Sequence, residues 1–257
     1  MAQNGWLLHF DGVKLSVVTS YLRKRPGPAA NTTDLSVIQT FKTILSKEIC
    51  CIIVRETNRK GKSATALYNS MLAEKYPNVS ARPPANEFIP FTAEEFDAFL
   101  GILLVRGVHK SNTENIEELW SSDAIPLVRA AMSKTRFQHL LKCIRFDNQA
   151  TRAERTKTDK AAAIRDVWTM MDQNLQKKNY KPSASVAIDE QLFPYIRRTM
   201  FLQYIDSKPA KYGIKIFWCC CCQTAYPLRS QIYLSKQPGE ERQKNVGGRV
   251  VLDLVGQ

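Results

Sequence analysis

The spacing of apolar residues changes near the middle of the chain. Up to about residue 180, apolar residues recur every three or four positions, as they do along one face of a helix. After Lys181-Pro182 they alternate or form short runs rich in β-branched residues, which is typical of strands. The pattern therefore predicts an α+β fold in which a helical part precedes a strand-rich part.

Four helices are predicted in the first part. The clearest begins at Thr92, which can cap the helix N-terminus while Glu95 reaches back in a capping box, with Phe91 and Phe96 spaced for a hydrophobic staple. The other helices are expected to begin at Asp34 (continuing toward Glu56), at Ser133 and near Asp159. The residues expected to face inward are Val37, Ile38, Phe41 and Leu45; Phe96, Phe99, Leu100, Leu103 and Leu104; Phe137, Leu140, Leu141 and Ile144; and Ile164, Val167, Trp168, Met171 and Leu175.

Three strands are predicted in the second part. The first is the apolar run Val186–Ile188, which ends at Asp189, and the second is Tyr212–Cys221. In the second strand Ile214, Ile216 and Trp218 share one face, and Leu228, Ser230, Ile232 and Leu234 mark the third strand. These patterns divide the chain into an irregular N-terminal segment (1–33), a helical domain (34–181) and a strand-rich region (182–257).

Charge favours a polyanionic partner. The 257 residues carry 37 Lys and Arg against 24 Asp and Glu, a net charge of +13. Such an excess indicates nucleic acid first and an anionic membrane second. Residues 191–249 hold ten basic and three acidic residues, whereas residues 87–123 hold eight acidic and two basic ones. The positive field is therefore concentrated in the C-terminal third, near Asp189.

Other features exclude several classes of protein. The apolar patch Trp6-Leu7-Leu8 is interrupted by His9 and Asp11, so no signal peptide is expected, and no run approaches the roughly 20 apolar residues of a membrane span. We expect an intracellular protein with reduced thiols and no membrane partner. The run Cys219–Cys222 lacks the spacing of paired zinc ligands and is expected to fill strand positions on alternating faces, so no zinc is expected.

Asp189 and a later basic segment form the candidate site. A carboxylate after an apolar run can bind a metal ion, cap a segment or form a salt bridge, and the residue alone does not decide among these roles. About twenty residues on, Lys208, Lys211 and Lys215 are suited to a phosphate backbone. Together they suggest metal-dependent chemistry on nucleic acid, although two-metal chemistry needs several carboxylates converging on ions about 4 Å apart.

Short pieces of the chain resemble, in the same order, the piggyBac-type DNA transposases. They are Arg55–Arg59, Phe99–Leu103, Leu119–Asp123, Met132–Phe137, Ile188–Leu192, Gln203-Tyr204 with Ser207–Lys215, and Gly248–Leu254. The resemblance covers about residues 37 to 257, and its most specific piece is Ser207–Lys215.

The resemblance implies a helical dimerisation and DNA-binding domain followed by an RNase H-like catalytic domain, in a nuclear protein. Such enzymes cut and paste DNA with three Asp that bind two Mg²⁺ ions. Asp189 matches the first of these Asp, as both a catalytic residue and a metal ligand. The DNA contacts that the resemblance implies are Arg198, Lys208, Lys211 and Lys215.

Several departures from the family change the expectation. The second and third Asp, and the family's cysteine-rich zinc-binding region, have no counterpart, so the RNase H-like domain is expected to be incomplete. Tyr195-Ile196-Arg197-Arg198 replaces Phe-Arg-Gly-Arg, with only Arg198 in place, and Asp206 stands where the family tends to have an uncharged residue. We therefore expect a truncated or domesticated transposase derivative that binds DNA, has one position of the DDD motif, and does not cleave DNA alone.

Two other hypotheses remain. The helical half could be a protein-interaction module that forms a homodimer or pairs with a full-length relative. The chain could also be a relic without function, because half of an RNase H-like sheet leaves a strand edge unpaired.

Overall fold

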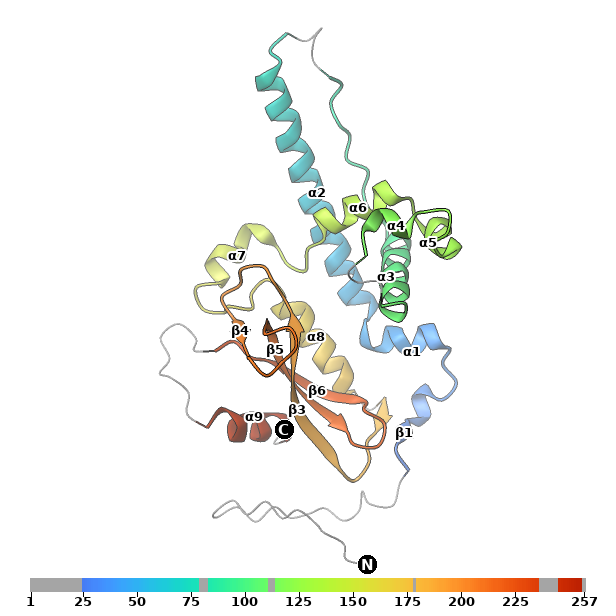
Figure 1. Cartoon of the computed structure of the whole chain (residues 1–257), viewed down its shortest axis with the longest axis vertical. Helices are drawn as coiled ribbons and strands as arrows, with labels where there is room; N and C mark the ends of the chain where they lie inside the picture. The colour runs from blue at the N-terminus through green and yellow to red at the C-terminus, as the bar shows by residue number, and fades with distance from the viewer. Residues whose placement is uncertain (1–24, 79–82, 111–113, 178, 236–244, 256–257) are drawn as a thin grey trace, which may run out of the picture.

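The computed structural model describes residues 25–78, 83–110, 114–177, 179–235 and 245–255 (Figure 1). The fold combines helices with a β-sheet, as predicted, and the strands of this sheet pair antiparallel. The helices are α1 (Val37–Ile44), α2 (Lys47–Lys75), α3 (Ala93–Val108), α4 (Ile116–Leu119), α5 (Pro126–Ala131), α6 (Lys134–Cys143), α7 (Gln149–Arg155), α8 (Arg165–Gln176) and α9 (Val246–Val255), with a short 3-10 helix, η2 (Ala30–Thr32), before α1. None of the helices in these ranges is both long enough and apolar enough to cross a membrane.

Local capping sets several helix starts. The predicted capping box of α3 is confirmed: Glu95 N donates to Thr92 Oγ1 at 3.2 Å, and Thr92 N donates to Glu95 Oε2 at 3.1 Å. The Ser133 cap of α6 is also confirmed, because its hydroxyl accepts from Arg136 N. Each cap gives a backbone donor of the first turn a partner that the helix itself cannot supply.

Two predicted helix starts are wrong. Ser36, not Asp34, caps α1, and the expected helix toward Glu56 is broken after Ile44, so that α2 begins separately at Lys47. The helix expected near Asp159 begins only at Arg165, because the carboxylate of Asp159 organises a preceding turn. Asp159 accepts from Ala161 N at 2.9 Å and forms an ion pair with Arg165 at 2.7 Å.

The helical core lies where α2, α3 and α6 pack together. Its buried members include Ile49, Ile53, Phe96, Phe99, Ile102, Phe137 and Leu140. The ring centroids of Phe99 and Phe137 are 5.2 Å apart, and those of Trp120 and Phe137 are 5.0 Å apart. This aromatic group fixes the crossing of α3 and α6.

Some residues expected in that core are exposed. Leu103 is 38% exposed and Leu104 is 56% exposed, because α3 buries the line through Phe96, Phe99 and Ile102 instead. Val37 is 90% exposed, so the apolar stripe predicted for α1 has little cover within the described residues. The helical period was right in both cases, but the neighbouring elements cover a different or narrower face.

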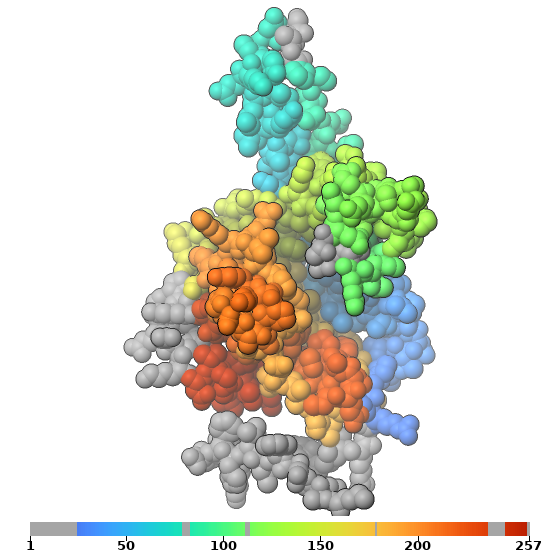
Figure 2. All heavy atoms as spheres, in the orientation of Figure 1, coloured from blue at the N-terminus to red at the C-terminus, as the bar shows by residue number. Residues whose placement is uncertain are grey.

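Helix α2 extends beyond the core. It has 29 residues, and its second half projects from the body together with the returning segment 83–90 (Figures 1 and 2). Asn69 ties this segment down, since its side chain bonds both N–H and C=O of Asn86. Asn58 does the same for Phe91.

The sheet is built around one central strand. It consists of β3 (Val186–Pro194), β4 (Leu202–Tyr204), β5 (Tyr212–Cys221) and β6 (Pro227–Ile232). β5 pairs antiparallel with β3 on one side, and with β4 and then β6 on the other. In the described part of the chain β3 has no strand on its outer side, so it is an edge strand.

Two helices cover the two faces of the sheet. Trp168 of α8 packs with Ile214, Ile216 and Trp218 on one face, which confirms the predicted shared face of β5. Val250 and Leu254 of α9 pack with Phe217 and Cys219 on the other face. Because Val167 of α8 joins the helical core, α8 links the helical core to the sheet.

Two further details concern strand pairing. A bulge between Cys219 and Cys220 shifts the register of β6, so Leu228 packs on the α9 face, away from Ser230. At the N-terminal end, β1 (Gly27–Pro28) pairs with β2 (Tyr180–Lys181), so the described end of the predicted segment 1–33 is anchored. Residues 1–24 of that segment lie outside the described residues.

Candidate active site and nucleic-acid interface

Asp189 lies in the middle of a strand. The sequence suggested that the strand ends there, but Asp189 is the fourth residue of β3, which has nine residues and continues to Pro194. The continuation follows from pairing, since Glu190 to Pro194 are all in register with β5. Asp189 Oδ1 accepts from Glu190 N at 2.7 Å, and the side chain is exposed.

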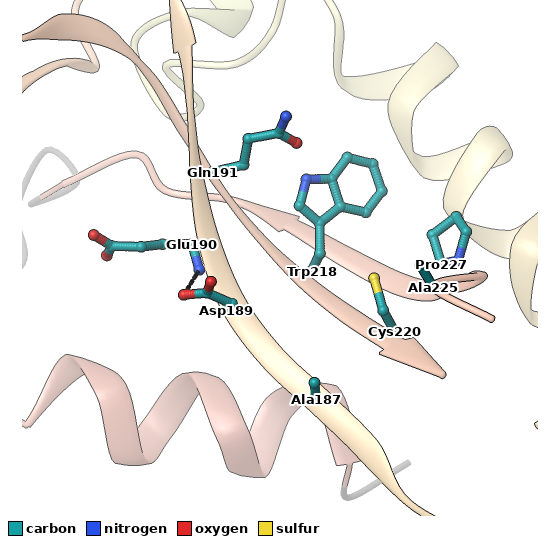
Figure 3. Close-up of a pocket in the computed structure, with 8 residues that line it drawn as sticks. All are labelled: Ala187, Asp189, Glu190, Gln191, Trp218, Cys220, Ala225 and Pro227. Atoms are coloured by element: carbon teal, nitrogen blue, oxygen red, sulfur yellow. Dashed lines mark hydrogen bonds between the residues drawn. The ribbon is translucent and has the colours of Figure 1, made fainter. Parts of the chain in front are cut away.

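A hollow of about 530 Å³ opens beside Asp189. It is lined by Ala187, Asp189, Glu190, Gln191, Trp218, Cys220, Ala225 and Pro227 (Figure 3). Strand alternation explains why these side chains line the same hollow. On β3, the residues Ala187, Asp189 and Gln191 share one face. On β5, Trp218 and Cys220 share the same face of the sheet. The hollow is thus a mostly apolar surface with a carboxylate and an amide at its edge.

Lys215 lies on the opposite face of the sheet. Its ammonium forms an ion pair with Glu190, and Figure 3 shows the Glu190 side chain directed away from Trp218. The Lys215 ammonium also lies 4.6 Å from the ring centroid of Phe217. Because the two residues lie on opposite faces, the structure does not bring Lys215 together with Asp189. Only 18% of the Lys215 side chain is exposed.

The other predicted DNA contacts gather at one end of the sheet. Arg198 lies in the loop between β3 and β4, and Lys208 and Lys211 lie in the loop between β4 and β5. Since Tyr204 pairs with Tyr212 and Pro194 pairs with Gly213, both loops close over the same strand ends. Among the described residues, Arg198 and Lys208 form no ion pair, and Arg198 is exposed.

The end of the sheet that carries Arg198, Lys208 and Lys211, here called the basic end, is separated from Asp189. The strand end at Pro194 lies five residues beyond Asp189, a span of roughly 17 Å at the rise of an extended strand. The sequence placed the basic loop directly beside the carboxylate, and the paired strand shows that it is farther away. A ligand that reaches both must therefore be extended along the sheet.

Asp206 modifies the basic end. Its carboxylate accepts from Tyr204 OH at 2.9 Å and forms an ion pair with Lys211 at 3.2 Å. The hydrogen bond from Tyr204 and then that from Lys211 lower the pKa of Asp206, so it stays ionised near neutral pH. Part of the positive field is thereby neutralised within the loop between β4 and β5, which carries both Asp206 and Lys211.

The donor set around Asp189 does not make a two-metal site. Glu190, the adjacent carboxylate, faces the other side of the sheet and is paired with Lys215. No group of three or more His, Cys, Asp or Glu side chains converges anywhere in the described ranges. Asp189 could supply one oxygen ligand to a divalent ion, but two-metal chemistry needs further carboxylates that these residues do not bring together.

The burial of the run Cys219–Cys222 alternates as expected for residues at the end of strand β5. Cys219 and Cys221 are buried while Cys222 is exposed, as expected for alternating faces. Cys221 Sγ accepts from Ser183 N at 3.3 Å and from Tyr180 OH at 3.6 Å, so it anchors the segment that leads into β3. Burial raises the pKa of the Cys219 thiol, which keeps it protonated.

Sequence reasoning placed Trp218 only in the core. The structure also places it at the hollow, directly across the strand pair from Asp189. The alternating pattern identified the face of β5 correctly, but only the pairing register brings these two residues together. No signal in the sequence fixes that register.

The chain is similar to transposases and to transposase-derived proteins. Residues 36–257 match the family described as Transposase IS4. The chain is 28% identical over 166 residues to the human PiggyBac transposable element-derived protein 3, and equally to the human Chimeric ERCC6-PGBD3 protein. In both cases the match covers 63% of this chain, but only 27% and 15% of those proteins.

A solved structure shares the fold. The cryo-EM structure of a piggyBac transposase synaptic complex with hairpin DNA superimposes with a TM-score of 0.76 at 27% identity. The match covers 91% of this chain and 46% of that one. Transposases of this kind typically depend on a divalent metal. The chain belongs to the piggyBac-type transposase family.

Proposed function

We propose that the chain is a transposase-derived DNA-binding protein. The observation that carries the proposal is the gathering of Arg198, Lys208 and Lys211 at one end of the sheet that also holds Asp189. Basic side chains gathered in this way suit successive phosphates of a DNA backbone. The solved piggyBac transposase is in a complex with hairpin DNA, which supports the same class of ligand for this chain.

The proposal extends to the architecture. Residues 34–181 form a helical dimerisation and DNA-binding domain, and residues 182–257 contribute strands of an RNase H-like domain, after the N-terminal segment 1–33. The protein acts in the nucleus, as a homodimer or with a full-length relative. Family membership supports these assignments, together with the position of the sheet after the helical core.

The 257-residue polypeptide alone is expected not to cleave DNA. One carboxylate at Asp189 cannot hold the two Mg²⁺ ions that the family mechanism needs. The test is incubation of the purified chain and its Asp189→Ala variant with Mg²⁺ and DNA that carries a transposon-like end. Equal absence of nicking in both is expected, whereas specific nicking that Asp189→Ala abolishes would contradict the proposal.

A second candidate function is a protein-interaction module. The observation that favours it is the exposed apolar side of α1, where Val37 and Ile38 have little cover. The two functions respond differently to salt. A phosphate-binding interface loses affinity steeply as salt rises, whereas an apolar helix interface changes little.

Removing the charge of Asp206 is expected to strengthen DNA binding. Asp206→Asn releases Lys211 from its ion pair and removes a repulsive charge, so affinity should rise about 2- to 10-fold near 0.1 M salt, with a steeper salt dependence. Filter binding to duplex DNA across a salt series measures both the affinity and its salt dependence. The matched control is Glu154→Gln, an exposed acid on α7 that pairs with Lys157. An equal gain in both variants would show that net charge alone matters.

A further inference from the structure

The floor of the hollow beside Asp189 is aromatic. Asp189 and Trp218 are partners in the register of β3 and β5, so their Cβ atoms lie about 4.5–5.5 Å apart. The candidate metal-ligand position and the indole therefore lie side by side on one face of the sheet. A nucleotide bound along the sheet beside Asp189 has this indole within reach of its base or of the next one.

Trp218 is held in a fixed orientation. Its ring packs against that of Trp168 on helix α8, which covers this face of the sheet, with ring centroids 5.9 Å apart at 52°. Its Nε1 is buried, and no hydrogen-bond partner for it occurs among the described atoms. The contact with Trp168 makes the ring a preorganised aromatic platform, which needs little ordering when a planar ligand binds.

Gln191 gives the platform a polar edge. It lies on the same face of β3 as Asp189, and Figure 3 shows its amide on the same side of the sheet as the indole. An amide offers both donors and an acceptor, which matches the edge of a nucleobase. Ala187, Cys220 and Pro227 complete an apolar border around it.

We propose that Trp218 and Gln191 form a binding site for one unpaired nucleobase of a DNA end. The inference rests on the proposed DNA-binding function and names a subsite within it. Aromatic side chains stack on bases of any sequence because every base has a π-face. A base within a duplex is already stacked on both sides, so the site distinguishes unpaired ends from blunt duplex.

The test compares two labelled DNAs that share one duplex, one blunt and one with three unpaired nucleotides at one end, in EDTA. The wild-type chain is expected to bind the second about 5- to 100-fold more tightly. Trp218→Leu, which keeps an apolar side chain without the π-face, should lose this preference and keep the blunt-duplex affinity. Tyr68→Ala, which removes an exposed aromatic on α2, is the matched control and should change neither.

Far-UV circular dichroism checks that Trp218→Leu folds. If Trp218→Leu does not fold, the fluorescence of Trp218→Phe is measured in its place. DNA with unpaired nucleotides should quench the tryptophan fluorescence of the wild-type chain and not that of Trp218→Phe. An end preference that is absent, or that persists in Trp218→Leu, would overturn the inference while duplex binding stands. Absence of all salt-dependent duplex binding would overturn the proposed function and this subsite with it.

Discussion

Replacing Phe137 by alanine is expected to destabilise the protein by about 3–5 kcal/mol. Phe137 is 0% exposed and contacts both Phe99 and Trp120, so its removal leaves a cavity between α3 and α6. This loss is a large part of the roughly 5–15 kcal/mol by which a domain is stable. Urea unfolding followed by far-UV circular dichroism measures it.

Leu104→Ala is the matched control. Leu104 belongs to the same helical region but is 56% exposed, so its truncation should change the free energy of unfolding by less than about 0.5 kcal/mol. Sequence periodicity alone assigned both residues to the core. Equal destabilisation by the two variants would therefore contradict the observed orientation of α3.

Features that depend on neighbouring residues could be predicted from the sequence. The capping box of Thr92 and Glu95 is set by groups three residues apart, and the alternation of Ile214, Ile216 and Trp218 follows from the two-residue period of a strand. The family could be predicted as well, because short pieces matched in order along most of the chain.

Features that depend on residues far apart in the sequence could not be predicted from it. Whether Leu103 is covered depends on how α3 packs against other helices, and the placement of Lys215 on the face opposite Asp189 depends on the pairing of β3 with β5. A one-residue change of register would exchange the two faces. The position of Asp189 within its strand was wrong for the same reason, since pairing with β5 extends the strand to Pro194.

Neutralising the basic end of the sheet is expected to have the largest effect on DNA binding. The triple variant Arg198→Gln, Lys208→Gln, Lys211→Gln removes together the three side chains that we propose contact phosphate. Affinity for duplex DNA should fall on the order of 100-fold at low salt, because each contact also releases a counterion. The matched control is Lys47→Gln, Lys75→Gln, Lys157→Gln, which removes the same charge from exposed positions on α2 and after α7.

The most direct test of DNA binding through this end of the sheet is filter binding of the wild-type chain and both triple variants across a salt series. For the wild-type chain we expect log affinity to fall linearly with log salt. In the Arg198, Lys208, Lys211 variant the slope of this line should become shallower by about 2 to 3. The control triple variant should keep the wild-type slope. A wild-type affinity that does not respond to salt, or equal slopes in the two variants, would contradict the account.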